Sequence, residues 1–222
     1  MAKNALHYET VSDILKESLQ KLMSNPLLES FRLVGGTNLS LRFGHRKSED
    51  IDLFTDALYE SVDFDEIEDC ISAEFPYCDR PDKSPFVGMG RSYYIGKNPD
   101  KCVKLDLMYT EPFMNASEVI DGIRMARVED IIAMKLNVIQ TSGRKKDFWD
   151  LHFLLDFYPI EEMIKLHKLR YPWEQDQGLI LKGLINFEKA NNDFDPNCLL
   201  LKDWDDIKLD FIYEVEKIKR QQ

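Results

Sequence analysis

The sequence predicts an α+β fold, with a mixed core of strands and helices over residues 1–115 and a mostly helical part over residues 116–222. Three observations support this prediction. A strand, a pair of glycines, a short helix and a second strand follow one another in residues 31–54. Runs rich in β-branched and aromatic residues, broken by Gly and Asn-Pro, predict two or three more strands between residues 84 and 109. After residue 128, apolar residues recur mainly at helical spacing.

The stretch from residue 31 to residue 54 organises the first part of the chain. Its sequence is FRLVGGTNLSLRFGHRKSEDIDLF. Gly35 and Gly36 allow the backbone to turn sharply and to approach a phosphate closely. We expect Thr37 or Asn38 to cap the following helix, whose N-terminal N–H groups favour an anion. This order of elements is suited to holding a nucleoside triphosphate.

Asp50 and Asp52 carry most of the predicted chemistry. They lie two residues apart in a strand, so both side chains project from the same face of the sheet. Adjacent carboxylates repel each other unless a cation or a proton lies between them. Mg²⁺ commonly binds one or two carboxylates together with substrate phosphates. The pair therefore predicts a metal site, and the alternative is two solvated aspartates at the end of a strand.

Asp106 is a candidate third carboxylate. Residues 102–109 alternate as a strand, with Asp106 on the polar face and an apolar face formed by Val103, Leu105 and Leu107. Taken alone, Asp106 could be an ordinary edge carboxylate. In the same sheet as Asp50 and Asp52 it becomes a candidate member of a phosphoryl-transfer site, where carboxylates converge from neighbouring strands.

The helical patterns carry less chemistry. Ser12 or Thr10, Asp63 and Asp203 are candidate N-caps. Lys135 is the one cation within an otherwise apolar helix, so its ammonium reaches either the surface or an anion. Helices are predicted at about residues 10–24, 63–75, 128–141, 160–170, 176–190 and 203–220.

A basic turn, Arg144-Lys145-Lys146, precedes a further helix. The chain is acidic, with a net charge of −11, so its overall field does not attract nucleic acid. The basic turn is the densest candidate patch for a nucleic-acid acceptor. Asp147 and Asp150 follow it in the first turns of the helix, where the dipole stabilises acids, so their role is either catalytic or structural.

Composition excludes several classes of protein. The sequence has no run of about 18 apolar residues and no apolar segment typical of a secretory signal at its N-terminus, so we expect no membrane span and a cytoplasmic protein. Its four cysteines are widely spaced and form no CxxC motif. They are typical of reduced thiols rather than of a disulfide framework or a zinc site.

Two segments resemble a known family. The segments GGTNLSLRFGHRKSEDIDLF and MKLNVIQTSGRKKDFWDLHFLL are similar to motifs of the AbiEii/AbiGii-type nucleotidyltransferase toxins. The resemblance covers roughly residues 30–158, and Lys146 stands where the family usually has arginine. It implies a polymerase-β-like nucleotidyltransferase core, a mixed sheet flanked by helices, followed by a mostly helical C-terminal part.

The resemblance also implies roles for individual residues. It implies that Asp50, Asp52 and Asp106 bind Mg²⁺, with Asp106 helping to deprotonate an acceptor hydroxyl. It places Lys135 near the triphosphate as a catalytic and binding residue, and Asp147 near the nucleotide or the acceptor. The remaining residues expected to contact the nucleotide are Gly35, Gly36, Thr37, Arg46 and Ser48.

These observations lead to the hypothesis of a Mg²⁺-dependent nucleotidyltransferase that moves an NMP from an NTP to an acceptor hydroxyl. The resemblance implies a toxin of a toxin–antitoxin pair, linked to phage defence, with a separate antitoxin protein as partner and the 3′ end of tRNA as one acceptor. A small molecule or a protein is an alternative acceptor. A non-catalytic binding module on the same fold is the alternative from another class.

Overall fold

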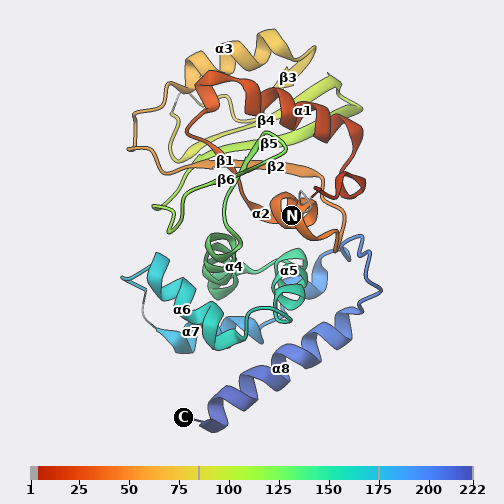
Figure 1. Ribbon diagram of the computed structural model, residues 1–222, viewed down its shortest axis with the longest axis vertical. Helices are drawn as coiled ribbons and strands as arrows, with labels where there is room; N and C mark the ends of the chain where they lie inside the picture. Colours follow the sequence, from red (N-terminus) through yellow and green to blue (C-terminus); the bar gives the residue numbers. More distant parts are fainter. Residues whose placement is uncertain (1–4, 85, 175, 222) are drawn as a thin grey trace. The chain divides into compact units, whose positions relative to one another are not determined.

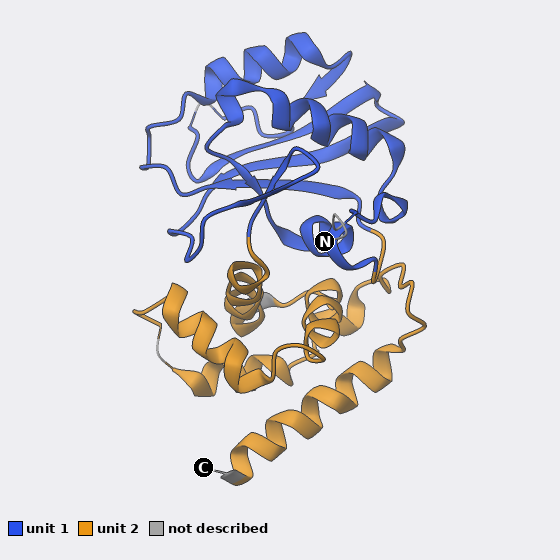
Figure 2. Cartoon of the chain, viewed as in Figure 1, with its two compact units in different colours: residues 1–44, 48–126 blue, residues 45–47, 127–222 orange. Residues whose placement is uncertain are grey.

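The computed structural model describes residues 5–84, 86–174 and 176–221 (Figure 1). The chain divides into two compact units (Figure 2). Unit 1 contains Met1–Gly44 and Ser48–Ala126, and unit 2 contains His45–Lys47 and Arg127–Gln222. The sequence predicts a boundary after residue 115. The division instead follows Ala126, because two short strands after residue 115 join the sheet of unit 1.

Unit 1 is built on a mixed sheet of seven strands within the described residues, in the order β3-β4-β5-β2-β1-β7-β6. The central pair, β2 and β5, is parallel, and β1 is antiparallel to β2. Together with the helices, this sheet confirms the predicted α+β class. The strands are β1 (Arg32–Leu33), β2 (Asp50–Thr55), β3 (Tyr77–Asp79), β4 (Gly90–Asn98), β5 (Lys101–Tyr109), β6 (Glu118–Ile120) and β7 (Ile123–Met125).

Two helices cover one face of this sheet, α1 (Asp13–Ser24) and α3 (Phe64–Glu74) (Figure 1). Their predicted caps are confirmed. The Ser12 hydroxyl accepts a hydrogen bond from the Leu15 N–H, and the Asp63 carboxylate accepts from two N–H groups of its first turn. Because strand side chains alternate between faces, the other face of β2 and β5 is left for polar groups. The buried core between the helices and the sheet includes Leu15, Leu19, Leu22, Ile51, Leu53, Ile67, Ile71, Val103, Leu105 and Leu107.

Helix α2 (Gly35–Phe43) begins directly after β1. The expectation that Thr37 or Asn38 caps this helix is wrong, because the helix starts at Gly35 and both residues lie inside it. Their side chains bond to other segments instead. The Asn38 amide donates to the Leu33 carbonyl at 2.7 Å and to the Ala126 carbonyl at 3.1 Å. The helix is thereby fastened to β1 and to the end of β7.

Unit 2 is helical in its described part. The predicted helix over residues 176–190 is shorter in the structure, where α7 ends at Leu184 and a 3₁₀ turn follows at Ala190–Asn192. Asn-rich sequence favours turns over helix, which accounts for the difference. The helices are α4 (Val128–Ser142), α5 (Lys145–Leu154), α6 (Ile160–Arg170), α7 (Gln177–Leu184) and α8 (Trp204–Gln221). Among the described residues, no helix is both long and apolar enough to cross a membrane.

Arg124 on β7 holds three backbone carbonyls of unit 1, those of Phe31, Met23 and Leu28, at 2.7–3.0 Å. We predict that Arg124→Ala lowers the free energy of unfolding by roughly 2–4 kcal/mol, because it leaves these acceptors without a charged donor. Circular dichroism should record a fall in melting temperature of about 5–15 °C.

The control for this prediction is Lys101→Ala, which removes an exposed cation at the start of β5. Lys101→Ala should leave the melting temperature within a degree or two of wild type. Equal melting temperatures for Arg124→Ala and Lys101→Ala would contradict the assignment.

Candidate functional site

Three carboxylates share the polar face of β2 and β5. Asp50 and Asp52 project from β2, while Ile51 and Leu53 of the same strand are fully buried. In the parallel ladder, Asp52 lies opposite Asp106. The structure therefore brings together the three carboxylates that the sequence singled out, on neighbouring strands of one sheet.

Both oxygens of Asp106 have partners within the sheet. Its Oδ1 accepts a hydrogen bond from the Ser92 hydroxyl at 2.5 Å, from the opposite position on β4. Its Oδ2 lies 2.5 Å from the Lys104 ammonium, two residues earlier on β5. The Asp106 carboxylate is thus held in one orientation by a hydroxyl and a cation.

Lys104 neutralises part of this acidic face. It lies opposite Asp50 in the ladder, and its Nζ is ion-paired with Asp106. Burial opposes its charge, but the hydrogen bond to Asp106 and the fields of Asp106, Asp50 and Asp52 together raise the pKa of Lys104. The ammonium stays charged at neutral pH and offsets the mutual repulsion of the carboxylates.

Gly35 brings the backbone of the glycine turn against Asp52. Its φ is +68°, a left-handed conformation that favours glycine. A Cβ at Gly35 would lie 2.3 Å from Asp52 Oδ2, so only glycine leaves room for the carboxylate. The Val34 N–H also donates to the Asp52 carbonyl at 2.9 Å. The glycine turn and the Asp-x-Asp strand are therefore adjacent, as the sequence predicted.

Thr37 and Ser48 form a hydroxyl pair beside this turn. Thr37 Oγ1 lies 2.8 Å from Ser48 Oγ and hydrogen-bonds to the Asp50 carbonyl. Thr37 is fully buried. The pair ties the first turn of α2 to the start of β2, so the backbone that carries Asp50 and the backbone that carries Gly35 are fixed together.

Unit 2 contains a separate buried cluster around Asp150. The Arg46 guanidinium binds both oxygens of this carboxylate, at 2.6 Å and 2.8 Å. His45 Nε2 lies 2.7 Å from Asp150 Oδ1, and its ring stacks on Phe153. The third partner of Asp150 is Lys135. All three partners are nearly inaccessible, and Asp150 is completely buried.

Lys135 bridges the two carboxylates that follow the basic turn. Its Nζ lies 2.7 Å from Asp147 Oδ1 and 2.8 Å from Asp150 Oδ2. Burial alone would raise the pKa of Asp150, but Arg46 and Lys135 hold it well below its usual range. In the same way Lys135 lowers the pKa of Asp147 against the effect of burial. Asp147 also accepts from the Arg144 N–H at 3.1 Å, so it stabilises the helix start as well.

The predicted residues fall into two groups. Gly35, Thr37, Ser48, the Asp50–Asp52 pair and Asp106 meet in unit 1. Arg46, Lys135 and Asp147 belong to the ion-pair cluster of unit 2, and their contact with a nucleotide stays a prediction. Gly36 lies in the first turn of α2 beside Gly35.

Sequence reasoning missed Lys104, Ser92 and the central place of Asp150. A signal existed for Lys104, because it lies two residues before Asp106 on the polar face of the same strand. A signal also existed for Asp150, which lies three residues after Asp147 on one helix face. Ser92 carried no signal, because its place opposite Asp106 depends on the register of β4.

The donor set suits a metal that completes its coordination from substrate. Asp50 and Asp52 share one face, and the Asp52 carboxylate lies against the backbone of Gly35. Among the described residues, no group of three or more His, Cys, Asp or Glu side chains is placed to hold a metal ion. Mg²⁺ bound by one or two carboxylates and by triphosphate oxygens fits these residues, whereas a cage made wholly of protein ligands does not.

The basic turn after α4 is not the open patch that we expected. Lys145 is buried, and its Nζ lies 2.8 Å from Asp195 and 5.3 Å from the centre of the Trp204 ring. Arg144 Nε lies 4.0 Å from Asp193. Lys145 is therefore engaged within unit 2, whereas the Arg144 side chain is 56% exposed.

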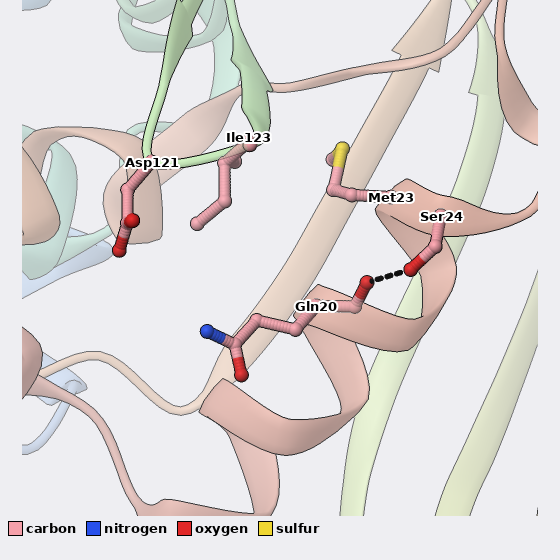
Figure 3. A pocket seen from close by; sticks show the side chains of 6 residues that line it. Gln20, Met23, Ser24, Asp121 and Ile123 are labelled. Atoms are coloured by element: carbon pink, nitrogen blue, oxygen red, sulfur yellow. Dashed lines mark hydrogen bonds between the residues drawn. The ribbon is translucent and has the colours of Figure 1, made fainter.

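A pocket of about 320 Å³ lies in unit 1 between α1 and the turn that joins β6 to β7 (Figure 3). None of the predicted site residues lines it. Its polar groups include Gln20 and Asp121, and the Asp121 carboxylate accepts a hydrogen bond from the Tyr8 hydroxyl at 2.7 Å. This pocket has no cation and no clustered carboxylates, so we assign it no part in the chemistry.

The mixed sheet, the glycine turn at the start of α2 and the carboxylates on β2 and β5 define a nucleotidyltransferase core. The family described as "Nucleotidyl transferase AbiEii toxin, Type IV TA system" matches residues 18–221. The chain belongs to this family of toxin–antitoxin nucleotidyltransferases, as its motifs predicted. Membership makes it an enzyme and removes the non-catalytic alternative.

The chain is also similar to individual proteins in sequence and in fold. An uncharacterized protein of Aquifex aeolicus (strain VF5) is 31% identical over 189 residues, which span 80% of this chain and 84% of that protein. JHP933 of Helicobacter pylori has a similar fold, with a TM-score of 0.58 at 20% identity over 95% of this chain and 94% of the other. The nucleotidyltransferase toxin MenT4 of Mycobacterium tuberculosis H37Rv gives a TM-score of 0.59 at 11% identity, covering 91% and 82%.

We predict that Asp150→Asn lowers the stability of unit 2 by about 3–5 kcal/mol, because it leaves two buried cations without their shared carboxylate. The tryptophans of the chain, Trp149, Trp173 and Trp204, all lie in unit 2, so urea unfolding followed by their fluorescence measures this unit. Asp156→Asn, which changes an exposed acid just after the same helix, should leave the midpoint unchanged.

The loss of stability caused by Asp150→Asn should be larger at neutral pH than in acid. The folded-state pKa of Asp150 is lowered, so its contribution is complete above the unfolded value of about 4 and is lost as pH falls toward the folded pKa. The difference in stability between wild type and Asp150→Asn should therefore be full at pH 7 and shrink below about pH 4. A difference that widened on acidification would contradict the cluster.

Proposed function

We propose that this protein is a Mg²⁺-dependent nucleotidyltransferase that moves an NMP from an NTP to an acceptor hydroxyl and releases pyrophosphate. The observation that carries the proposal is the placement of Asp52 between Gly35, which its carboxylate touches, and Asp106, which lies opposite it in the ladder. A phosphate-binding turn, a metal-binding pair and a further acid are thereby lined up on one sheet. Positioning and charge neutralisation supply most of the catalysis in such phosphoryl transfers.

Asp50 and Asp52 would hold Mg²⁺, with triphosphate oxygens completing its coordination. When bound, the ion would neutralise charge on the phosphoryl oxygens. The backbone at Gly35 and Gly36 would approach the triphosphate, because glycine has no side chain to keep a phosphate at a distance. The N–H groups at the start of α2 would donate to its oxygens. Thr37 and Ser48 would keep this turn in register with β2.

Asp106 would act on the acceptor. Its carboxylate is held by Ser92 and Lys104 in a fixed orientation beside Asp52. In the reaction, the acceptor oxygen forms a bond to the α-phosphorus, the bond from that phosphorus to the bridging oxygen of pyrophosphate breaks, and the hydroxyl proton leaves. Asp106 is placed to accept this proton, directly or through water, and Lys104 prevents excess negative charge from accumulating there.

The partners follow from the family. An antitoxin protein is the expected regulator, and an RNA, with the 3′ end of tRNA as one case, is the acceptor that we propose. Incubation with each of four labelled NTPs, Mg²⁺ and total RNA tests acceptor and base together. Label on RNA supports the proposal. Label only on protein or on a small molecule would show that the acceptor is not RNA.

We predict that Asp52→Asn reduces transfer at least about 100-fold, because it removes one charge of the pair that binds the metal. Asp50→Asn should have a similar effect. Thermal unfolding of both variants should occur at or above the wild-type temperature, since fewer repelling carboxylates remain on the strand. Asp100→Asn, in the exposed turn between β4 and β5, is the matched control and should transfer normally. Wild-type turnover by Asp52→Asn would refute the assignment.

A second prediction concerns the glycine turn. Gly35→Ala should abolish detectable transfer, because its Cβ would overlap Asp52 Oδ2 and its φ is positive. Gly122→Ala is the matched control, since it also has a positive φ of +77° but no atom within 4 Å of the added Cβ. Gly122→Ala should lose some stability and keep its transfer rate per folded molecule. Equal activity of the two variants would show that the contact with Asp52 is unimportant.

A further inference from the structure

A small pocket adjoins the third carboxylate on the side of β4. It has a volume of about 160 Å³ and is lined by residues of β4, β5 and the segment before β4. Ser92 belongs both to this lining and to the support of Asp106, whose Oδ1 accepts its hydroxyl hydrogen bond at 2.5 Å. The lining residues are Arg80, Asp82, Phe86, Gly90, Arg91, Ser92 and Met108.

The order of strands places this pocket on one side of the reaction. The glycine turn follows β1, the metal-binding pair is on β2, Asp106 is on β5, and the pocket lies at β5 and β4. These strands are neighbours in the order β1, β2, β5, β4. A triphosphate at the glycine turn and a ligand in the pocket would therefore lie on opposite sides of the carboxylates. The pocket is on the side from which an acceptor hydroxyl would reach Asp106.

The lining suits one flat, polar ring. Phe86 is 84% exposed, although aromatic side chains of this size are usually buried. Met108 contributes a polarizable thioether, which favours contact with aromatic rings. Arg80 is 17% exposed, and its guanidinium is oriented by Glu68 at 3.2 Å and by the Ser84 carbonyl at 2.9 Å. An oriented guanidinium can donate hydrogen bonds to a base edge or stack on its face.

Gly90 keeps this lining open. Its φ is +152°, and a Cβ there would lie 2.0 Å from the Leu107 carbonyl and 2.7 Å from Met108 Sδ. Gly90 and Met108 are opposite each other in the ladder. The glycine thus lets the Met108 side chain lie across β4 as part of the pocket wall.

The pocket is too small for a whole nucleotide with its phosphates. Complete small ligands usually occupy roughly 300–1,000 Å³. A volume of about 160 Å³ admits one part of a larger ligand, with the remainder outside. Single-stranded RNA is recognised in this way, by stacking individual bases on aromatic side chains and arginine.

We infer that this pocket binds the terminal nucleobase of an RNA acceptor, and that Phe86, Met108 and Arg80 position the acceptor hydroxyl at Asp106. The inference rests on the proposed function and deepens it by naming the substrate class and its subsite. Phe86 thereby determines specificity for the acceptor. It takes no part in NTP binding, which occurs on the other side of β2.

The test measures the KM for the acceptor and the affinity for NTP in separate experiments. Phe86→Ala should raise the apparent KM for total tRNA in the labelled-NTP assay at least about tenfold, the loss expected for one stacked base. Its calorimetric affinity for each Mg²⁺–NTP should equal that of wild type. Phe86→Leu should behave like Phe86→Ala, because it keeps apolar bulk without a flat ring, and Phe86→Tyr should restore wild-type KM. Phe194→Ala, which removes a Phe that is 99% exposed in unit 2, is the matched control and should change nothing.

Phe86→Trp supplies a second readout that needs no turnover. It places a tryptophan in unit 1, where wild type has none, so the variant-minus-wild-type fluorescence reports this pocket. AMP, CMP, GMP and UMP, used as probes without Mg²⁺, should quench that signal, with at least one base preferred. Arg80→Gln in the same background should weaken the quenching.

Three results would count against binding of a terminal base in this pocket. Unchanged acceptor KM in Phe86→Ala would overturn the inference while the transfer reaction itself stood. A loss of NTP affinity with unchanged acceptor KM would assign the pocket to the incoming nucleotide and overturn it too. If wild type labels no RNA, the proposed acceptor fails, and quenching of Phe86→Trp by the monophosphates then decides whether a base site exists. Absence of quenching would show that no base binds in this pocket.

Discussion

The repulsion among three carboxylates on one sheet face is the constraint on which unit 1 depends. Asp50, Asp52 and Asp106 project from adjacent parallel strands, an arrangement that costs free energy unless cations compensate. Lys104 supplies one compensating charge from within the sheet. Because the carboxylates are fixed by the strands, they cannot relax apart. A metal ion bound at these carboxylates would add further positive charge, which is the role that we propose for it in phosphoryl transfer.

Much of unit 1 could be predicted because its signals are local. The two-residue period of β2 and β5 placed Asp50, Asp52 and Asp106 on polar faces, and Asp63 marked the start of α3. The start of α2 was misplaced because Gly35 itself enters the helix with a positive φ, so Thr37 became an interior residue. Propensity favours a cap at threonine, and the close contact between Gly35 and Asp52 overrides it.

The rest could not be predicted because it depends on register and on long-range pairing. Ser92 supports Asp106 only through the antiparallel register of β4, which no local pattern encodes. Asp150 sits 104 residues from Arg46, yet the two share a bidentate ion pair. A basic triplet in the sequence indicated an open patch, but Lys145 is buried against Asp195 and Trp204. Charge type is visible in a sequence, whereas the direction of a charged side chain is set by its partners.

The order of strands determines the order in which the features of the site follow one another across the sheet. From β1 through β2 and β5 to β4, the sheet carries a backbone turn without side chains, a pair of carboxylates, a third carboxylate tethered by a hydroxyl and an ammonium, and a pocket with an exposed aromatic ring. Adjacent strands lie about 4.8 Å apart, so four strands span roughly 14 Å, about the reach of a nucleotide and the terminal residue of its acceptor. In the proposed reaction, these strand spacings would set the distance between the donor phosphate and the acceptor hydroxyl. The segment before β4 would then need to supply only the ring that selects the acceptor, and Phe86 lies in that segment.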